Sequence, residues 1–194
     1  IFFLTLFFPS IVIFNNSIKV NLLIRVKSTK THVRWSNMDG PLKNLLVVDL
    51  TRVLVGPYCT MILSDLGARV IKVEAPEIGD DSRKFGPFIK DYSAYFMSLN
   101  RGKESIALNL KNDEDKKIFE KILSKADILV ENFKPGTLEK WGFGWKDVNK
   151  KYPKLIYASA SGFGQTGPLK ELPAYDMVVQ GMGGLMSVTG QPNS

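Results

Sequence analysis

Histidine and cysteine are almost absent from this chain of 194 residues, which holds one of each, His32 and Cys59. A Ser-His-Asp or Cys-His nucleophile pair needs an imidazole base in the folded part of the chain, and no histidine follows residue 38. A zinc site usually takes three or four Cys or His ligands, so we expect no metal. A single cysteine forms no internal disulfide, which is typical of a reducing compartment.

Acidic residues are missing from the first 37 positions, which carry five basic side chains and therefore supply +5 of the formal net charge of +7. The rest of the chain is nearly balanced, which argues against a nucleic-acid partner. Residues 1–14 are strongly apolar, but a membrane-spanning helix needs about 18 such residues. This leader is interpreted as upstream sequence ahead of a start at Met38, with a mitochondrial transit peptide or a membrane anchor as alternatives. We expect a cytoplasmic protein without a membrane partner, or a mitochondrial one if the leader is a genuine transit peptide.

From residue 42 onward, short apolar runs alternate with helical stretches. The patterns predict strands at 45–50, 69–74, 105–110, 128–131 and 155–159, and helices at 57–66, 92–99 and 112–125. Asn112 is expected to cap the last of these helices. Alternating strands and helices predict an α/β fold with a mostly parallel sheet and helices on both faces.

An open parallel sheet binds its ligand at the carboxyl ends of its strands. The sequence does not have the spacing of either common nucleotide-binding motif, the dinucleotide fingerprint or the P-loop. The turn after the first strand reads T-R-V-L-V-G-P and lacks G-x-G-x-x-G, and Met97 occupies the place where a P-loop ending in Gly102-Lys103 needs a glycine.

Several polar residues have both a structural and a functional interpretation. Lys111, Lys134 and Lys140 follow predicted strands and could neutralise phosphates, or could be ordinary surface lysines. Asp176 precedes an apolar helix and is either its N-terminal cap or a functional carboxylate in a glycine-rich neighbourhood. Asp49 ends a strand and is expected to organise its turn.

Five collinear segments between about Leu42 and Gly190 carry a resemblance. They read LLVVDLTRVLVGPYCTMILSDLGARVIKVEAPEIGDDSR, NRGKESIALNLK, ADILVENFKPGTLEKWGFGW, YASASGFGQTGPL and PAYDMVVQGMGGLMSVTG. The chain resembles the class III CoA-transferases, of the CaiB/BaiF or formyl-CoA transferase type. The branch it looks most like moves CoA between dicarboxylates such as succinate and another acid. The resemblance implies a Rossmann-like large domain, a smaller second domain and a homodimer of interlocked subunits.

The resemblance also implies that coenzyme A, as acyl-CoA, is a substrate bound at the sheet edge. The implied contacts are Leu54, Val55, Ala75, Leu108, Asn109, Lys111, Asn132, Phe133, Lys134 and Lys140. Family members commonly place an arginine near the adenine at the position of Ala75, so this chain departs from the pattern there.

Family chemistry, as the resemblance implies it, uses one aspartate as nucleophile. Its carboxylate attacks the acyl-CoA thioester to give a mixed anhydride, and the CoA thiolate returns to form an aspartyl-CoA thioester. This aspartate follows the Thr189-Gly190 stretch in the family, so it is expected beyond Ser194. Tyr175 and Asp176 are expected to line the same site. Residues 38–194 are therefore interpreted as the N-terminal part of the large domain, inactive alone.

Two alternatives stay open. Related acyl-CoA racemases carry a histidine immediately before the position of Asp176, and Tyr175 stands there in this chain. Tyrosine is a poor general base near neutral pH, which disfavours racemisation. The other alternative is a non-catalytic chain that binds CoA or pairs with a full-length partner.

Overall fold

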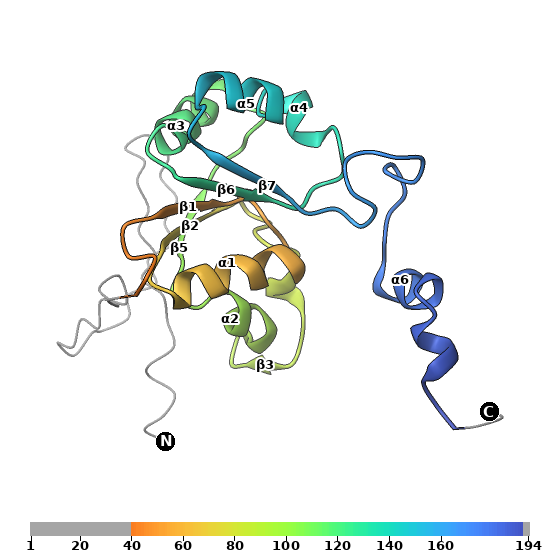
Figure 1. The fold of residues 1–194 in the computed structure, drawn as a ribbon. Coiled ribbons are helices and arrows are strands. Elements are labelled where there is room, and N and C mark those ends of the chain that lie inside the picture. The colour runs from red at the N-terminus through yellow and green to blue at the C-terminus, as the bar shows by residue number, and fades with distance from the viewer. Residues whose placement is uncertain (1–39, 192–194) are drawn as a thin grey trace.

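The computed structural model describes residues 40–191, so the leader and Met38 lie outside the described residues. Its centre is a five-stranded sheet of order β5-β2-β1-β6-β7 (Figure 1). The strands are β1 (Leu46–Asp49), β2 (Arg69–Glu74), β5 (Glu104–Ala107), β6 (Ile128–Glu131) and β7 (Ile156–Ser159). A separate hairpin joins β3 (Phe88–Ile89) and β4 (Tyr92–Ser93).

Helices between the strands cover the sheet, and a further helix follows β7. They are α1 (Val55–Asp65), α2 (Ala94–Asn100), α3 (Asp113–Leu123), α4 (Thr137–Trp141), α5 (Trp145–Lys151) and α6 (Asp176–Met182), with 3-10 turns η2 (Asp81–Lys84) and η3 (Leu185–Val188). Over residues 40–191, no helix has both the length and the apolar character needed to cross a membrane.

All pairings in the main sheet are parallel. The chain starts at β1, moves outward through β2 to β5, and then returns to the other side of β1 for β6 and β7. This order corresponds to strands 3-2-1-4-5 of the six-stranded dinucleotide-binding sheet, and it reverses between β1 and β6. The predicted α/β fold with a Rossmann-like parallel sheet is confirmed.

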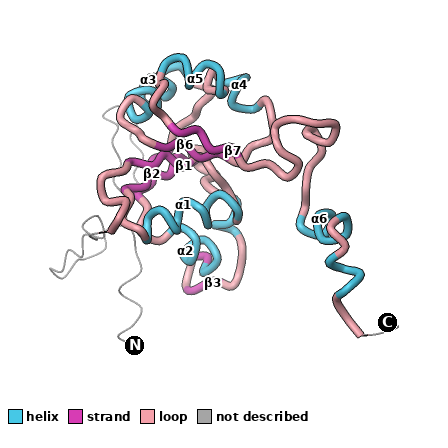
Figure 2. Tube along the Cα trace, viewed as in Figure 1, coloured by secondary structure: helices cyan, strands magenta, loops and turns pink. Residues whose placement is uncertain are grey.

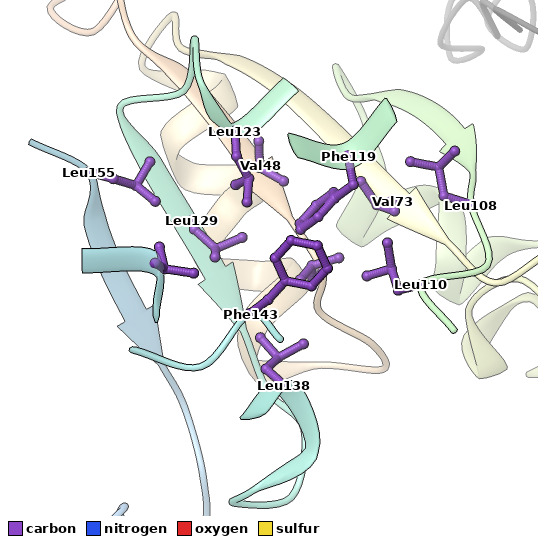
Figure 3. Close-up of a cluster of buried hydrophobic side chains, with 12 residues drawn as sticks. Val48, Val73, Leu108, Leu110, Phe119, Leu123, Leu129, Leu138, Phe143 and Leu155 are labelled. Atoms are coloured by element: carbon purple, nitrogen blue, oxygen red, sulfur yellow. The ribbon is translucent and has the colours of Figure 1, made fainter. Parts of the chain in front are cut away.

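Helices cover both faces of the sheet, as predicted (Figure 2). Helices α1 and α2 lie on one face, and α3, α4 and α5 lie on the other. The larger core is on the α3 side, where leucine, valine and phenylalanine side chains from the sheet and three helices interlock (Figure 3). Phe119 of α3 is fully buried there, and its ring lies edge-on to Phe143 with centroids 4.8 Å apart.

The start of α3 follows from its sequence as expected. Asn112 has an extended backbone, and its side-chain oxygen accepts a hydrogen bond from the Glu114 amide at 2.8 Å. Three acidic residues fill the first turn, where the helix dipole favours negative charge. The helix then buries Phe119 and Leu123 against the sheet.

The structure corrects several predicted boundaries. The helix predicted to begin at Pro57 begins at Val55, with Pro57 still in its first turn. The helix predicted from residue 92 begins at Ala94, because Tyr92 and Ser93 pair with β3 and the Ser93 hydroxyl caps the helix. The strand predicted over 105–110 ends at Ala107.

Asp176 is not an N-terminal cap. Tyr175 occupies the cap position of α6, without a side-chain hydrogen bond, and Asp176 is the first helical residue. Its carboxylate accepts a hydrogen bond from the side-chain Nε2 of Gln180 instead. The capping interpretation was therefore wrong by one residue.

Helices α4 and α5 were not predicted. Both are short, and glycines separate them from their neighbours: Gly136 and Gly142 bound α4 with φ of 82° and 85°. Each helix contributes one buried residue, Leu138 and Val148. One buried residue in a helix of five or seven residues leaves no helical period to recognise.

We predict that Phe119→Ala lowers the free energy of unfolding by about 3 to 5 kcal/mol, because it removes a buried ring and leaves a cavity. Phe88→Ala is the matched control, since Phe88 is 53 % exposed and its loss should change stability by less than about 0.5 kcal/mol. Urea unfolding followed by circular dichroism measures both. Equal effects of the two variants would contradict this description of the core.

Candidate functional site

The carboxyl ends of β1 and β6 meet where the strand order reverses, and the loops that follow these strands are joined there. The Asn132 side chain accepts a hydrogen bond from the Arg52 amide and donates one to the Arg52 carbonyl, both at 2.8 Å. The Arg52 guanidinium lies 5.5 Å from the centre of the Phe133 ring. Ligands of open α/β sheets bind at such a reversal. This junction is therefore the best-placed part of the predicted site.

Asp49 organises the turn after β1, as predicted. One of its oxygens accepts hydrogen bonds from the Thr51 amide at 2.8 Å and the Thr51 hydroxyl at 2.5 Å. The other accepts from the Thr60 hydroxyl at 2.7 Å and from Lys103 at 3.0 Å. The carboxylate is fully buried, and both of its oxygens accept hydrogen bonds from neighbouring protein groups, so its role is structural.

Buried ionised groups continue from Asp49 along β2. Lys72 lies 2.9 Å from Asp80, and both side chains are almost completely buried. Glu74 accepts hydrogen bonds from Arg83 at 2.6 and 2.7 Å and from Ser105 at 2.6 Å. These acid–base pairs form a polar layer beneath the edge of the sheet.

The pKa values of this layer follow from burial and pairing. Burial by itself would raise the pKa of each carboxyl, but nearby cations and hydrogen bonds together outweigh it and lower the pKa of all three acids. The acids are Asp49, Glu74 and Asp80. Burial also lowers the pKa of Lys103 to about 8, although Asp49 opposes that shift. The three acids are therefore held as carboxylates.

The predicted CoA contacts near the reversal are partly open to solvent. Leu54 is 48 % exposed and Val55 is 66 % exposed, at the start of α1. Phe133 is half-buried, and its ring lies edge-on to Trp141 at 5.3 Å between centroids. Lys134 and Lys140 are exposed, in the loop after β6 and in α4 respectively. These five side chains offer apolar surface and positive charge near one edge.

The other predicted contacts follow β2 and β5. Leu108 is buried in the core and its amide donates to the Glu74 carbonyl, so its side chain has a packing role. The Asn109 side chain accepts a hydrogen bond from the exposed Lys111's amide at 3.1 Å. Ala75 is exposed directly after β2. Because β5 and β2 lie beside β1, these residues share the carboxyl edge with the loops described above.

Tyr175 and Asp176 are not brought to this edge. Both are exposed, and Figure 1 shows α6 standing clear of the sheet beyond β7. Their predicted place in the same site therefore remains a prediction.

Glu131 was missed by the sequence analysis. It ends β6 directly before Asn132, is 5 % exposed, and accepts hydrogen bonds from the Phe133 amide at 2.8 Å and from the Ser159 hydroxyl. Burial raises its pKa, against the effect of these hydrogen bonds. The sequence carried one indication of this role, since Glu131 is an acidic residue at the end of an otherwise apolar strand.

A cavity of about 290 Å³ lies beside this edge, bounded by β2, β5, α2 and β4. Its walls include Lys72, Glu74, Phe96, Met97 and Lys103, and none of the predicted CoA contacts. Three of the charged groups in this wall are already paired: Lys72 with Asp80, Glu74 with Arg83, and Lys103 with Asp49. Across residues 40–191, no cluster of three or more Cys, His, Asp or Glu side chains could hold a metal ion.

Comparison with known proteins assigns the family. The model of CoA-transferase family III matches residues 42–194. The chain belongs to this family. It is 56 % identical over 154 residues to an acetyl-CoA:oxalate CoA-transferase from Acetobacter aceti, which covers 79 % of this chain and 40 % of that protein. It is 47 % identical over 158 residues to the human succinyl-CoA:glutarate CoA-transferase, covering 81 % and 36 %.

A solved structure agrees with the family assignment. A CaiB/BaiF family protein from Brucella suis superposes with a TM-score of 0.77 at 44 % identity, covering 81 % of this chain and 43 % of that one. The chain thus spans about two fifths of the length of the relatives it matches.

Glu74→Gln tests the polar layer. Because the folded pKa of Glu74 is lowered, its stabilising contribution is present above the ordinary value of 4.5 and is lost as the pH falls through the folded pKa. We expect the variant to lose about 2 kcal/mol of unfolding free energy at pH 7. It should also lose less further stability on acidification than the parent protein does.

The matched control for Glu74→Gln is Glu104→Gln, which breaks the partly exposed ion pair with Arg69 at 2.8 Å and should cost less than about 1 kcal/mol. Urea unfolding at pH 3 to 8 measures how the free energy of unfolding depends on pH in the parent protein and in both variants. Parallel profiles for the parent and Glu74→Gln would contradict the assigned pKa.

Proposed function

We propose that the intact protein transfers CoA from an acyl-CoA thioester to a carboxylic acid. One observation carries the proposal: in a chain of CoA-transferase family III, exposed apolar and basic residues follow neighbouring parallel strands where the strand order reverses. That is where an anionic cofactor with a long organic arm is expected to bind. The relatives are named for oxalate and for glutarate, so the common element of the proposal is CoA, and the acid is left open.

The described residues supply the CoA-binding part of the proposed site. Lys111, Lys134 and Lys140 are exposed, which leaves their ammonium groups available to phosphates. Leu54 and Val55 offer apolar surface to the organic part of the cofactor. Asn132 fixes the loop that carries them, through both of its hydrogen bonds to Arg52.

The proposed chemistry uses an aspartate beyond Ser194. One carboxylate oxygen attacks the thioester carbonyl carbon, the carbon–sulfur bond breaks, and the CoA thiolate leaves as the mixed anhydride forms. The thiolate then attacks the aspartyl carbonyl carbon of the anhydride and releases the donor acid as its carboxylate. The acceptor acid takes CoA from the resulting aspartyl thioester by the same two steps in reverse. Glycine amides are suited to stabilise the oxyanions that form.

The proposal includes a homodimer of interlocked subunits. Apolar side chains of the segment from α6 to η3 support it, because Met177, Met182 and Val188 are 73 %, 63 % and 80 % exposed. Such a run of exposed apolar residues is suited to burial against further protein. Light scattering of the intact protein tests the dimer by its mass.

The test of the activity is CoA exchange. The intact protein is incubated with an acyl-CoA and a series of isotopically labelled dicarboxylic acids, and CoA esters of the labelled acids are measured by mass spectrometry. Labelled acyl-CoA is expected. Epimerisation at the α-carbon without exchange would favour a racemase, and CoA binding without turnover would favour the non-catalytic alternative.

Lys134→Ala tests the phosphate role. Loss of one charge-assisted contact with a phosphate should raise the KM for acyl-CoA about tenfold with little change in kcat. Lys121→Ala is the control, because Lys121 lies in the last turn of α3, away from the carboxyl edge, and it should leave KM unchanged. Initial-rate kinetics measure both. An unchanged KM in Lys134→Ala would remove Lys134 from the proposed site.

A further inference from the structure

Val53 has an unusual backbone conformation for a branched residue. Its φ is 69°, in the left-handed region that β-branched residues avoid because the side chain crowds the backbone. It lies directly before Leu54 and Val55 in the loop between β1 and α1. A residue persists in this region only where the surrounding contacts over-determine its conformation.

A buried ion pair supplies part of that support, beside the hydrogen bonds from the loop after β6. The Val53 amide donates to Asp80 Oδ1 at 3.1 Å, and Asp80 Oδ2 lies 2.9 Å from Lys72 Nζ. Lys72 Nζ in turn donates to the Thr51 carbonyl at 2.8 Å. The ion pair therefore binds both the Val53 amide and the Thr51 carbonyl, which flank Arg52 in the loop after β1.

The pair is itself anchored outside the loop. Lys72 belongs to β2, and Asp80 caps η2 by accepting hydrogen bonds from the Ser82 amide at 2.9 Å and the Ser82 hydroxyl at 2.7 Å. The Asp80 amide donates to Glu74 at 3.0 Å. On this side, the loop after β1 is thus held by the neighbouring strand β2 and the segment that follows it.

Stability alone gives little reason to keep these charges. Burying an ion pair costs desolvation of both ions, and apolar replacements of similar size are often equally stable. An apolar pair could not, however, donate to the Thr51 carbonyl or accept from the Val53 amide. The particular contribution of the charges is the shape of the loop.

We propose that Lys72 and Asp80 are positioning residues of the CoA site. By holding Val53 in its left-handed conformation, they present Leu54 and Val55 to acyl-CoA in a preorganised arrangement, which reduces the conformational entropy lost on binding. This inference rests on the proposed CoA-transferase function.

The test is the double variant Lys72→Met/Asp80→Ala in the intact protein, which removes both charges and so leaves neither unpaired in the interior. We expect the KM for acyl-CoA to rise about tenfold while kcat stays within about threefold, as expected for loss of binding common to ground and transition states. Adding Val53→Gly should lower the KM again, because glycine adopts a positive φ without support. Lys72→Met/Asp80→Leu, an apolar pair that fills more of the space but makes neither hydrogen bond to the loop, replaces the double variant if that protein does not fold.

Phe119→Leu is the matched control: it weakens the core on the opposite face without touching the loop, so its melting temperature falls and its KM stays unchanged. A folded variant with the parent's KM would overturn the inference, and so would a raised KM that Val53→Gly fails to lower. If the parent protein exchanges no CoA, the proposed function fails and the inference falls with it. If the parent protein exchanges CoA and the double variant has the parent's KM for acyl-CoA, the inference is refuted and the proposed function stands.

Discussion

The reversal of strand order at β1 is the constraint on which the rest of the structure depends. Because β1 pairs in parallel with β2 on one side and β6 on the other, the chain must leave its carboxyl end through a loop that lies between two other strand ends. That loop meets the loop after β6 through Asn132. Every residue placed here in the CoA site lies in or beside a segment whose position this pairing determines.

The two faces of the sheet are stabilised in different ways. On the α3 face, aliphatic and aromatic side chains around Phe119 form the larger core. On the other face, toward α1 and α2, buried lysines and carboxylates pair close to the carboxyl edge. Apolar packing is tolerant of small changes, whereas charge pairs in the interior are tied to one geometry. The rigid, directional interactions are thus concentrated beneath the loop whose conformation matters most.

Local pattern was enough to predict the five strands, the parallel sheet and the capped helix α3. The strands are marked by short runs of apolar residues, and the start of α3 is marked by the adjacent capping residue Asn112. The hairpin of β3 and β4, the helices α4 and α5, and the role of Asp80 were not predictable in this way. Asp80 stabilises a loop 27 residues away, and nothing near it in sequence specifies that partner. Glu131 likewise acquires its raised pKa from burial by the folded chain.

The helix termini at the carboxyl edge differ in their electrostatics. Three acidic residues in the first turn of α3 offset the positive end of its dipole, so attraction of an anion near β5 falls to lysines such as Lys111. Helix α1 has no acidic residue in its first turn and no capping side chain. A carboxylate from elsewhere in the chain lies beside this terminus, because Asp80 Oδ1 accepts a hydrogen bond from the Val53 amide two residues before α1. Because α1 begins at the loop that Lys72 and Asp80 contact, the ion pair that shapes this loop also places buried charge beside the start of the helix.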